Sequence, residues 1–331
     1  MFEAVTVIIP ALNEESSIES VISAVKRIVS GVACKYEIIV IDDGSTDGTL
    51  SCILKNDVTV IHHEKTIGYG ASIKEGIYTA SNENIVIIDS DGTYPANRIP
   101  DLLKTLETAD MAVGARIGHN VNIPLMRRPA KWILRILAEY ITSQKIPDLN
   151  SGFRAFRKSL VMEYMPILSD EFSFTTSVTV ALLSHKYVVR YIPIDYFKRV
   201  GKSKVMPRQF IDFVILVLRL SMRFNPLKVF VPIALACFFV GALKFCFDIY
   251  FAFYNIHGIT VEFLTRKVVS QTTLMLWLAG LQIMLVGMVA DGIILKVVQP
   301  YRSKRQFACK GANAFPHSSH ETLDQKNDSA K

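Results

Sequence analysis

The sequence lacks the markers of several common protein classes. It has five cysteines, an odd number, and they are scattered without the spacing of a metal site or a disulfide framework. We therefore expect a reducing compartment and cysteines that serve only in packing. No basic segment followed by an apolar segment and a cleavage site opens the chain, so we expect the first domain to stay in the cytosol.

Two common nucleotide-binding signatures are also missing. No Gly-x-x-x-x-Gly-Lys-Ser/Thr loop is present, which argues against a P-loop NTPase. The stretch Gly68-Tyr69-Gly70 lacks the third glycine of the dinucleotide-binding fingerprint. Any nucleotide site in this chain must therefore be built in another way.

What the sequence does have is an unusual balance of apolar and charged residues. Half of its 331 residues are hydrophobic and the mean hydropathy is +0.29, yet 20% are charged, which predicts a soluble domain joined to membrane segments. The net charge of +7 is uneven, because a run without acids precedes the most apolar third of the chain: Lys198, Arg199, Lys202, Lys204 and Arg208. No stacking aromatic residues alternate with this run, so we expect anionic headgroups or phosphate as its partner and not nucleic acid.

Short apolar segments alternate with helical patterns over the first two hundred residues. Strands are predicted at 4–9, 36–41, 58–61, 85–88, 112–114 and 190–195, with helices after a cap at Asn13 and at 68–79. This alternation predicts an α/β open sheet, in which ligands bind beyond the carboxyl ends of the strands.

Polar clusters follow three of these strands. They are Pro10-Ala11-Leu12-Asn13-Glu14, Asp42-Asp43 and Asp89-Ser90-Asp91. An Asp-x-Asp segment alone is also typical of an ordinary turn, but three clusters at one sheet edge favour a site. In an extended segment Asp89 and Asp91 leave the same face and can share Mg²⁺ or Mn²⁺. Such a cation, ligated by only two carboxylates, suits a nucleotide diphosphate.

The second part of the domain leaves more alternatives open. The basic amphipathic stretch at 124–143 fits either a solvated helix face or a helix that lies against acidic lipid or a phosphate. Asp148, in a polar loop at 147–154, is either a carboxylate near a reacting centre or the cap of a turn.

The last third of the chain predicts membrane attachment. We expect four regions: a catalytic domain at 1–206, an amphipathic interface helix at 207–226, a two-helix transmembrane domain at 227–299 and a polar, disordered tail at 300–331. The spans are predicted at 229–251 and 274–295, and flanking basic residues place both ends in the cytoplasm. Within the first span, Lys244 and Asp248 are one turn apart and are expected to pair. Three glycines leave room for helix association and hence for a homo-oligomer: Gly241, Gly280 and Gly287.

A series of segments resembles, in order, the motifs of family 2 glycosyltransferases of the polyprenyl-phosphate type, which include dolichyl-phosphate mannose synthase and bacterial polyprenyl-phosphate glucosyltransferases. The segments are 10–15, 41–49, 68–71, 89–95, 151–154 and 199–204. The resemblance implies a GT-A fold and inverting transfer of a sugar from a UDP- or GDP-linked donor. The implied acceptor is dolichyl or undecaprenyl phosphate, and the product would serve glycan or cell-envelope synthesis.

The resemblance also assigns residues. It places Pro10, Leu12, Glu14 and Asp43 at the nucleoside and Asp89 with Asp91 at the metal. It places Arg116, Arg127 or Arg128, Arg199, Ser203 and Lys204 at the acceptor phosphate. Further substrate-binding candidates are Asn13, Asp42, Ser151, Arg154 and Lys202, and the catalytic candidates are Asp91, Asp148, Arg199 and Lys204. Thr93 stands where some mannose synthases carry Gln, so their sugar preference does not transfer.

The chemistry of the acceptor fits this assignment. A phosphomonoester has a second pKa of about 6, so its oxygen is already an anion at neutral pH and needs positioning more than a general base. Arg199 and Lys204 could supply that positioning, although lipid headgroups are an alternative partner for both.

Two rival functions remain to be weighed. A polysaccharide acceptor is disfavoured, because neither Trp132 nor Trp277 completes the Gln-x-x-Arg-Trp pattern of processive synthases. A membrane scaffold that binds a nucleotide sugar without turnover is disfavoured by the intact Asp89, Asp91, Arg199 and Lys204.

Overall fold

The computed structural model describes residues 2–118, 128–198, 225–256 and 269–312, and five single positions between 215 and 222. At 128–131, 255–256 and 294–312 it describes the backbone alone. The predicted interface helix at 207–226 therefore lies mostly outside the described residues.

A seven-stranded sheet forms the centre of the N-terminal domain, with strand order β3-β2-β1-β4-β6-β5-β7. The strands are β1 (Phe2–Ala11), β2 (Ala33–Asp42), β3 (Thr59–His62), β4 (Asn84–Ile87), β5 (Met111–Ala115), β6 (Arg154–Arg157) and β7 (Val189–Pro193). All run in the same direction except β6, which pairs antiparallel with both β4 and β5. The predicted α/β sheet is confirmed, and it is mixed rather than parallel throughout.

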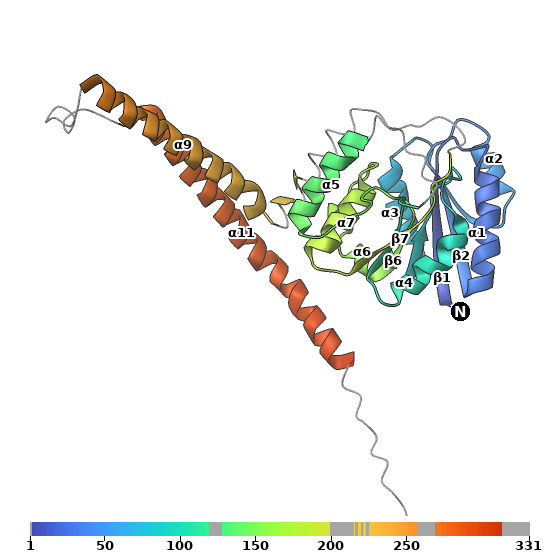
Figure 1. Ribbon diagram of the computed structural model, residues 1–331. Coiled ribbons are helices and arrows are strands. Elements are labelled where there is room, and N and C mark those ends of the chain that lie inside the picture. Colours follow the sequence, from blue (N-terminus) through green and yellow to red (C-terminus); the bar gives the residue numbers. More distant parts are fainter. Residues whose placement is uncertain are drawn as a thin grey trace, which may run out of the picture.

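Helices cover both faces of this sheet (Figure 1). They are α1 (Ile18–Val32), α2 (Thr49–Leu54), α3 (Tyr69–Thr79), α4 (Ile99–Leu106), α5 (Arg128–Thr142), α6 (Lys158–Met162) and α7 (Phe174–Ser184). Strand β1 is buried on both sides, because Val7 and Ile9 pack with α1 and α4 while Ile8 packs with α3 and α7. Near-continuous apolar strands of this kind are expected when helices cover both faces.

Two local expectations are wrong. Strand β6 occupies positions that the sequence assigns in part to a loop, since its four residues Arg154–Arg157 contain only two apolar side chains and are held by neighbours distant in sequence. Asn13 does not cap a helix, because α1 begins only at Ile18 after Ser17. Its backbone has φ 52°, and its side-chain oxygen accepts a 2.7 Å hydrogen bond from the Thr46 amide.

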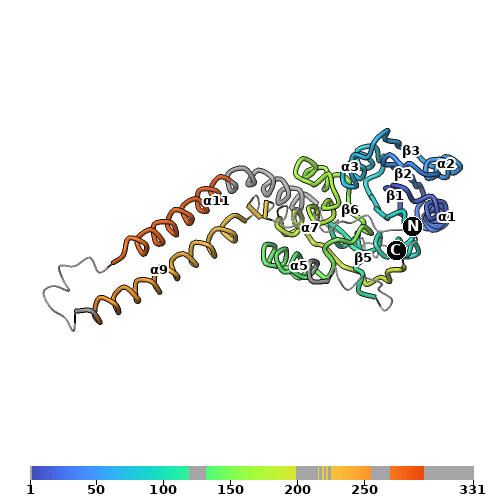
Figure 2. Tube along the Cα trace, turned by 90° about the horizontal axis from the view of Figure 1, so that it is seen from above, coloured from blue at the N-terminus to red at the C-terminus, as the bar shows by residue number. Residues whose placement is uncertain are grey.

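A helical hairpin, α9 (Leu227–Ile256) and α11 (Gln271–Ala312), extends away from the domain (Figures 1 and 2). Segments Leu227–Tyr254 and Gln271–Ile293 are long and apolar enough to cross a membrane. Helix α11 continues to Ala312, so the disordered tail predicted from 300 is wrong over 300–312. The segment is polar, but its Lys, Arg, Gln and Ala residues have high helix propensity, which does not depend on hydropathy.

Three glycines of the hairpin, Gly241, Gly280 and Gly287, allow its two helices to pack against each other. A Cβ at Gly241 would lie 2.5 Å from the Trp277 ring, and one at Gly287 would lie 2.6 Å from the Phe230 Cβ. Gly280 likewise faces the other helix, at the Ala234 carbonyl. These positions let α9 and α11 of one chain approach closely.

The predicted pair inside the first span is confirmed. The Lys244 ammonium contacts the Asp248 carboxylate, and Asp248 also accepts hydrogen bonds from the Ser270 amide at 3.1 Å and the Thr273 hydroxyl at 2.8 Å. Asp248 therefore joins α9 to the first turn of α11, which gives this half-buried charge a structural role.

Candidate active site

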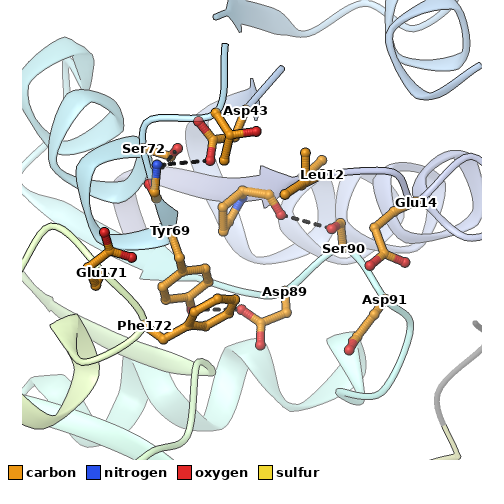
Figure 3. Close-up of a pocket in the computed structure, with 14 residues that line it drawn as sticks. Leu12, Glu14, Asp43, Tyr69, Ser72, Asp89, Ser90, Asp91, Glu171 and Phe172 are labelled. Carbon is orange, nitrogen blue, oxygen red and sulfur yellow. Dashed lines mark hydrogen bonds between the residues drawn. The ribbon is translucent and has the colours of Figure 1, made fainter. Parts of the chain in front are cut away.

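A pocket lies beyond the carboxyl ends of β1, β2 and β4, where the sequence places its three polar clusters (Figure 3). Its lining includes Pro10, Leu12, Glu14, Asp43, Tyr69, Asp89, Ser90, Asp91, Glu171 and Phe172. A hydrogen bond joins the first and third clusters, because the Ser90 hydroxyl donates to the Pro10 carbonyl at 2.8 Å. The Ser17 hydroxyl, just before α1, donates to the Ser90 carbonyl at 2.8 Å. The fold thus brings the three clusters together in one site.

Asp89 and Asp91 both line this pocket, and their carboxylates point to the same side of the loop after β4 (Figure 3). Asp89 accepts a 2.8 Å hydrogen bond from the Tyr69 hydroxyl. Asp91 accepts bonds from the Thr93 amide at 3.1 Å and the Thr93 hydroxyl at 2.6 Å. A Cβ at position 152 would lie 2.5 and 2.6 Å from the two Asp89 carboxylate oxygens, so Gly152 makes room for this side chain.

The donor set fits a divalent cation that is shared with a substrate. In the part of the chain that the structure describes, no group of three or more His, Cys, Asp or Glu side chains could hold a metal ion. Mg²⁺ and Mn²⁺ bind readily to one or two carboxylates when phosphate oxygens complete the coordination. Asp89 and Asp91 supply that number of carboxylates in a pocket that a ligand can enter.

Tyr69 supports Asp89 from the first turn of α3. Burial, the nearby Asp89 charge and the hydrogen bond to Asp89 raise the pKa of Tyr69 well above its usual value, so its hydroxyl stays protonated and donates. The Tyr69 ring stacks on Phe172 with centroids 5.6 Å apart and planes 7° from parallel. The sequence motif containing Tyr69 is recognisable, but its contact with Asp89 depends on the tertiary fold.

The loop at 168–173 forms a wall of the pocket that the sequence does not predict. It is fixed to α3, because the Lys74 ammonium binds the Leu168 carbonyl at 2.6 Å and the Asp170 carboxylate at 2.5 Å. The Ala71 amide also donates to the Asp170 carbonyl at 2.8 Å. Glu171 and Phe172 consequently face the pocket. The sequence of this polar loop between α6 and α7 has no pattern from which its position at the pocket could be predicted.

Asp43 lines the pocket and organises the chain around it. Its carboxylate accepts from the Ile67 amide at 2.9 Å, the Gly68 amide at 3.1 Å and the His63 Nδ1 at 2.9 Å. His63 Nε2 lies 2.7 Å from Glu75. Burial opposes a charge on His63, but hydrogen bonds to Asp43 and Glu75 and their charges outweigh it and raise its pKa above 6.5.

The neighbouring Asp42 differs from Asp43. It is fully buried and bonded to His62 Nδ1 at 2.8 Å and to the Ser45 amide at 3.3 Å, and it is not among the residues that line the pocket. Asn13 is also outside the lining, and its bonds to the Thr46 amide and Ser45 hydroxyl hold the loop after β2. These two candidates support the walls of the site.

Arg116 and Asp148 pair with each other. The Arg116 Nε and a terminal nitrogen bind the two Asp148 oxygens at 2.7 and 2.8 Å, and the Arg116 amide donates to Asp148 at 3.0 Å. Their side chains are only 8% and 11% exposed. Asp148 also accepts from the Asn150 amide at 3.2 Å, which is the turn-cap role left open by the sequence. Burial disfavours the charge on Arg116, but the nearby tyrosines, the charge of Asp148 and the hydrogen bond to Asp148 outweigh burial. They raise the pKa of Arg116 well above its usual value.

Aromatic contacts connect this ion pair to the metal-ligand candidates. The Arg116 guanidinium lies 5.2 Å from the centroid of the Tyr196 ring, and Tyr196 packs edge-on against Tyr94. The Tyr94 hydroxyl accepts a 2.9 Å hydrogen bond from the amide of Gly152, which touches Asp89. The Arg116–Asp148 pair therefore lies next to the reaction pocket without lining it.

Ser151 and Arg154 are buried in the domain. The Ser151 hydroxyl donates to the Gly114 carbonyl at 2.6 Å. Arg154 is fully buried and donates to the Ser151 carbonyl, to the Thr175 carbonyl at 3.0 Å and to the Thr179 hydroxyl at 3.2 Å. Burial lowers the pKa of Arg154. In this structure both residues tie β6 to β5 and α7, and neither lines the pocket.

The basic acceptor residues predicted from the sequence remain predictions. Arg127, Arg199, Lys202, Ser203 and Lys204 lie outside the described residues. Arg128 begins α5, but its side chain is also outside them.

Comparison with known protein families identifies two segments of the chain. Residues 6–165 match the Glycosyl transferase family 2 model, and residues 225–294 match the GtrB C-terminal hairpin model. Residues 6–165 are thus similar to a family 2 glycosyltransferase domain. The hairpin segment begins two residues before α9 and ends within α11.

Related proteins agree with this assignment. A dolichyl-phosphate hexose transferase of Haloferax volcanii is 28% identical over 212 residues, which are 62% of this chain and 88% of that protein. A dolichol-phosphate mannosyltransferase of Pyrococcus furiosus is 30% identical over 232 residues, which are 65% of this chain but only 63% of that protein.

A solved structure confirms the fold of the domain. Glucosyl-3-phosphoglycerate synthase from Mycobacterium tuberculosis, in complex with Mn²⁺, UDP and phosphoglyceric acid, superposes with a TM-score of 0.52 at 20% identity. The match covers 65% of this chain and 78% of that one. The N-terminal domain thus has the mixed α/β sheet of the GT-A type.

Proposed function

We propose that the protein transfers a sugar, with inversion, from a nucleotide-diphosphate sugar to a polyprenyl phosphate at the cytoplasmic face of a membrane. The observation that carries the proposal is a single pocket. Asp43, Asp89 and Asp91 converge there with Pro10 and Glu14, in a family 2 glycosyltransferase domain that is followed by an apolar helical hairpin.

The pocket suits a donor that carries a diphosphate. In our proposal Pro10, Leu12 and Asp43, which line the pocket, contact the nucleoside, and Asp89 and Asp91, which also line it, would hold a metal at the diphosphate. Mg²⁺ or Mn²⁺ held by these two carboxylates would neutralise the charge of the departing diphosphate. Tyr69 and Thr93 orient the two carboxylates, because each donates a hydrogen bond to one of them.

The acceptor side rests on chemistry and on the relatives. A polyprenyl phosphate presents an anionic oxygen that can attack the anomeric carbon without a strong base. The relatives from Haloferax and Pyrococcus are named as dolichyl- or dolichol-phosphate sugar transferases. In our proposal Arg199 and Lys204 hold the acceptor phosphate in line, while the Arg116–Asp148 pair stiffens the adjacent wall.

A transfer assay tests the proposal. Purified full-length protein in vesicles receives Mn²⁺ or Mg²⁺, a short polyprenyl phosphate and, in turn, radiolabelled UDP- and GDP-sugars. We expect one donor to label the lipid, and the label to disappear with EDTA or in Asp91→Asn. Label in a polymer would support a polysaccharide acceptor, and nucleotide-sugar binding without turnover would support a scaffold, so either result would contradict the proposal.

A further inference from the structure

Two adjacent histidines make the same kind of contact with two adjacent aspartates. His62 is the last residue of β3, and its Nδ1 lies 2.8 Å from the Asp42 carboxylate. His63 follows it, and its Nδ1 lies 2.9 Å from the Asp43 carboxylate. Asp43 lines the reaction pocket (Figure 3), whereas Asp42 is not among the residues that line it. The two pairs are therefore alike in chemistry and differ in whether they reach the ligand site.

The Asp43 carboxylate is held by donors from the segment 63–68. Its Oδ1 accepts from the His63 ring and from the Ile67 amide at 2.9 Å, and its Oδ2 accepts from the Gly68 amide at 3.1 Å. The side chain is only 6% exposed. A carboxylate can accept about four hydrogen bonds, so Asp43 retains acceptor capacity for a ligand in the pocket. Its orientation toward that ligand depends on these donors.

His63 lies between two carboxylates from different elements. While its Nδ1 meets Asp43, its Nε2 lies 2.7 Å from the carboxylate of Glu75 on α3. A neutral imidazole has one N–H, so it can donate to one of these carboxylates and must turn a lone pair toward the other. The doubly protonated ring donates to both, so the geometry favours this form.

The charges around the ring favour the same form. Burial alone would lower the pKa of His63, but the hydrogen bonds to Asp43 and Glu75 and the charges of both raise it above 6.5. Protonation of His63 cancels one of the two negative charges of these partners, so it lowers the repulsion that an anionic ligand meets at this wall. The charged or titratable neighbours come from three places: Asp42 and Asp43 at the end of β2, Glu75 on α3, and His62, Glu64 and Lys65 in the same segment as His63.

We propose that His63 is a positioning residue for the nucleotide: its doubly protonated ring holds the Asp43 carboxylate in place at the pocket and thereby strengthens the binding of a nucleoside diphosphate. In the described part of the chain, His63 is not among the residues that line the pocket, so it acts through Asp43. Glu75 contributes by keeping the ring protonated. The inference rests on the proposed function, since it needs a nucleotide in this pocket, but it is independent of the sugar and of the acceptor.

Binding of UDP and GDP to the full-length protein in detergent tests the inference. Calorimetry gives the dissociation constants of wild type and His63→Asn between about pH 5 and 9, the range in which a histidine titrates. Asparagine keeps an amide that can donate to Asp43 but has no charge. The terminal phosphate of the nucleotide also titrates, with a pKa of about 6, but this affects both proteins equally and cancels in the ratio of their affinities.

We expect wild type to bind the nucleotide about fivefold more tightly than His63→Asn at low pH, as for the loss of one charge-assisted hydrogen bond. This advantage should disappear as the pH rises through the raised pKa of His63, because the ring then loses its second proton. Equal affinities of the two proteins at every pH would overturn the inference.

Glu75→Gln separates positioning from packing. Glutamine can still accept a hydrogen bond from His63, but it removes the charge that favours the protonated ring. We expect the advantage over His63→Asn to be retained at low pH and to disappear at a lower pH than in wild type. If His63→Asn does not fold, the pH profiles of wild type and Glu75→Gln decide the question, and identical profiles overturn the inference.

His62→Asn is the matched control. It removes the same kind of contact from Asp42, which is not among the residues that line the pocket, so we expect the nucleotide affinity and its pH dependence to stay as in wild type. An equal loss in His62→Asn and His63→Asn would overturn the inference, because the end of β3 as a whole and not Asp43 would then set the affinity. Failure of wild type to bind either nucleotide at any pH would instead overturn the proposed function, and the inference with it.

Discussion

Asp91 and Asp148 carry the same charge and are both catalytic candidates by sequence, but the fold gives them different surroundings. Asp91 lines a pocket and is oriented by the Thr93 amide and hydroxyl. Asp148 is matched by the Arg116 guanidinium through two bonds of 2.7 and 2.8 Å. A carboxylate beside a pocket can bind a ligand, whereas one neutralised by a buried arginine mainly holds the fold. The difference predicts that loss of Asp91 affects activity and loss of Asp148 affects stability.

The largest effect is expected for Asp91→Asn. The change removes a charge from the proposed diphosphate site, and losses of one preorganised electrostatic group typically cost about 10²- to 10³-fold in kcat. Sugar transfer to lipid and thermal unfolding would both be measured. Asp57→Asn is the matched control, because Asp57 is fully exposed and its contact with Lys26 is 3.7 Å long. Activity of Asp91→Asn within a few-fold of wild type would remove the basis of the comparison.

Asp148→Asn should lower stability more than it changes the reaction. It leaves the Arg116 charge buried without its partner, and breaking one side of a buried pair costs about 3 to 5 kcal/mol. Denaturant unfolding of the detergent-solubilised protein would measure this. The double variant Arg116→Met/Asp148→Leu should recover part of the loss. If Asp148→Asn unfolds like wild type but is inactive, Asp148 belongs with Asp91 in the chemistry.

Tyr69→Phe should have an intermediate effect on the Asp89 side. It removes the 2.8 Å hydrogen bond to Asp89 but keeps the ring that stacks on Phe172. Removing a partner of a metal ligand typically costs about 10- to 100-fold in metal affinity. Titration of Mn²⁺ in the presence of UDP or GDP would measure it, with Tyr78→Phe as an exposed control. Unchanged Mn²⁺ affinity would show that Tyr69 is only a packing residue.

The smallest effect is expected for His63 and depends on pH. Because the folded protein raises the pKa of His63 above 6.5, its contribution to stability is fully present below pH 6.5 and is lost as pH rises through the raised pKa. The contribution should be roughly 1 kcal/mol, as for one hydrogen-bonded group. Unfolding midpoints from pH 5 to 9 should fall less steeply in His63→Asn than in wild type, and identical slopes would contradict the assignment.

The sequence predicts the parts of the fold that have a strong local pattern. Strands β1, β2 and β4 contain runs of branched apolar residues, and acidic clusters follow them, so the pattern of residues alone predicts their shared edge. The two helices that could cross a membrane are predictable for the same reason, since each is long and apolar.

The rest depends on contacts between distant residues. Strand β6 is defined by its pairing with β4 and β5, and its residues have little pattern of their own. Arg116 and Asp148 are 32 residues apart, so nothing in their spacing shows that they neutralise each other. The hydrogen bond from Lys228 to the end of α5 joins residues 87 positions apart, so the sequence does not predict it either.

The identity of the nucleotide released during transfer tests the central claim most directly. With the active donor and a short polyprenyl phosphate, the two products can be separated and weighed by mass spectrometry. If Asp89 and Asp91 hold the diphosphate as a leaving group, the nucleotide product is a nucleoside diphosphate and the lipid carries one phosphate and the sugar. A nucleoside monophosphate together with a lipid diphosphate sugar would contradict the account, because the broken bond would then lie between the two phosphates.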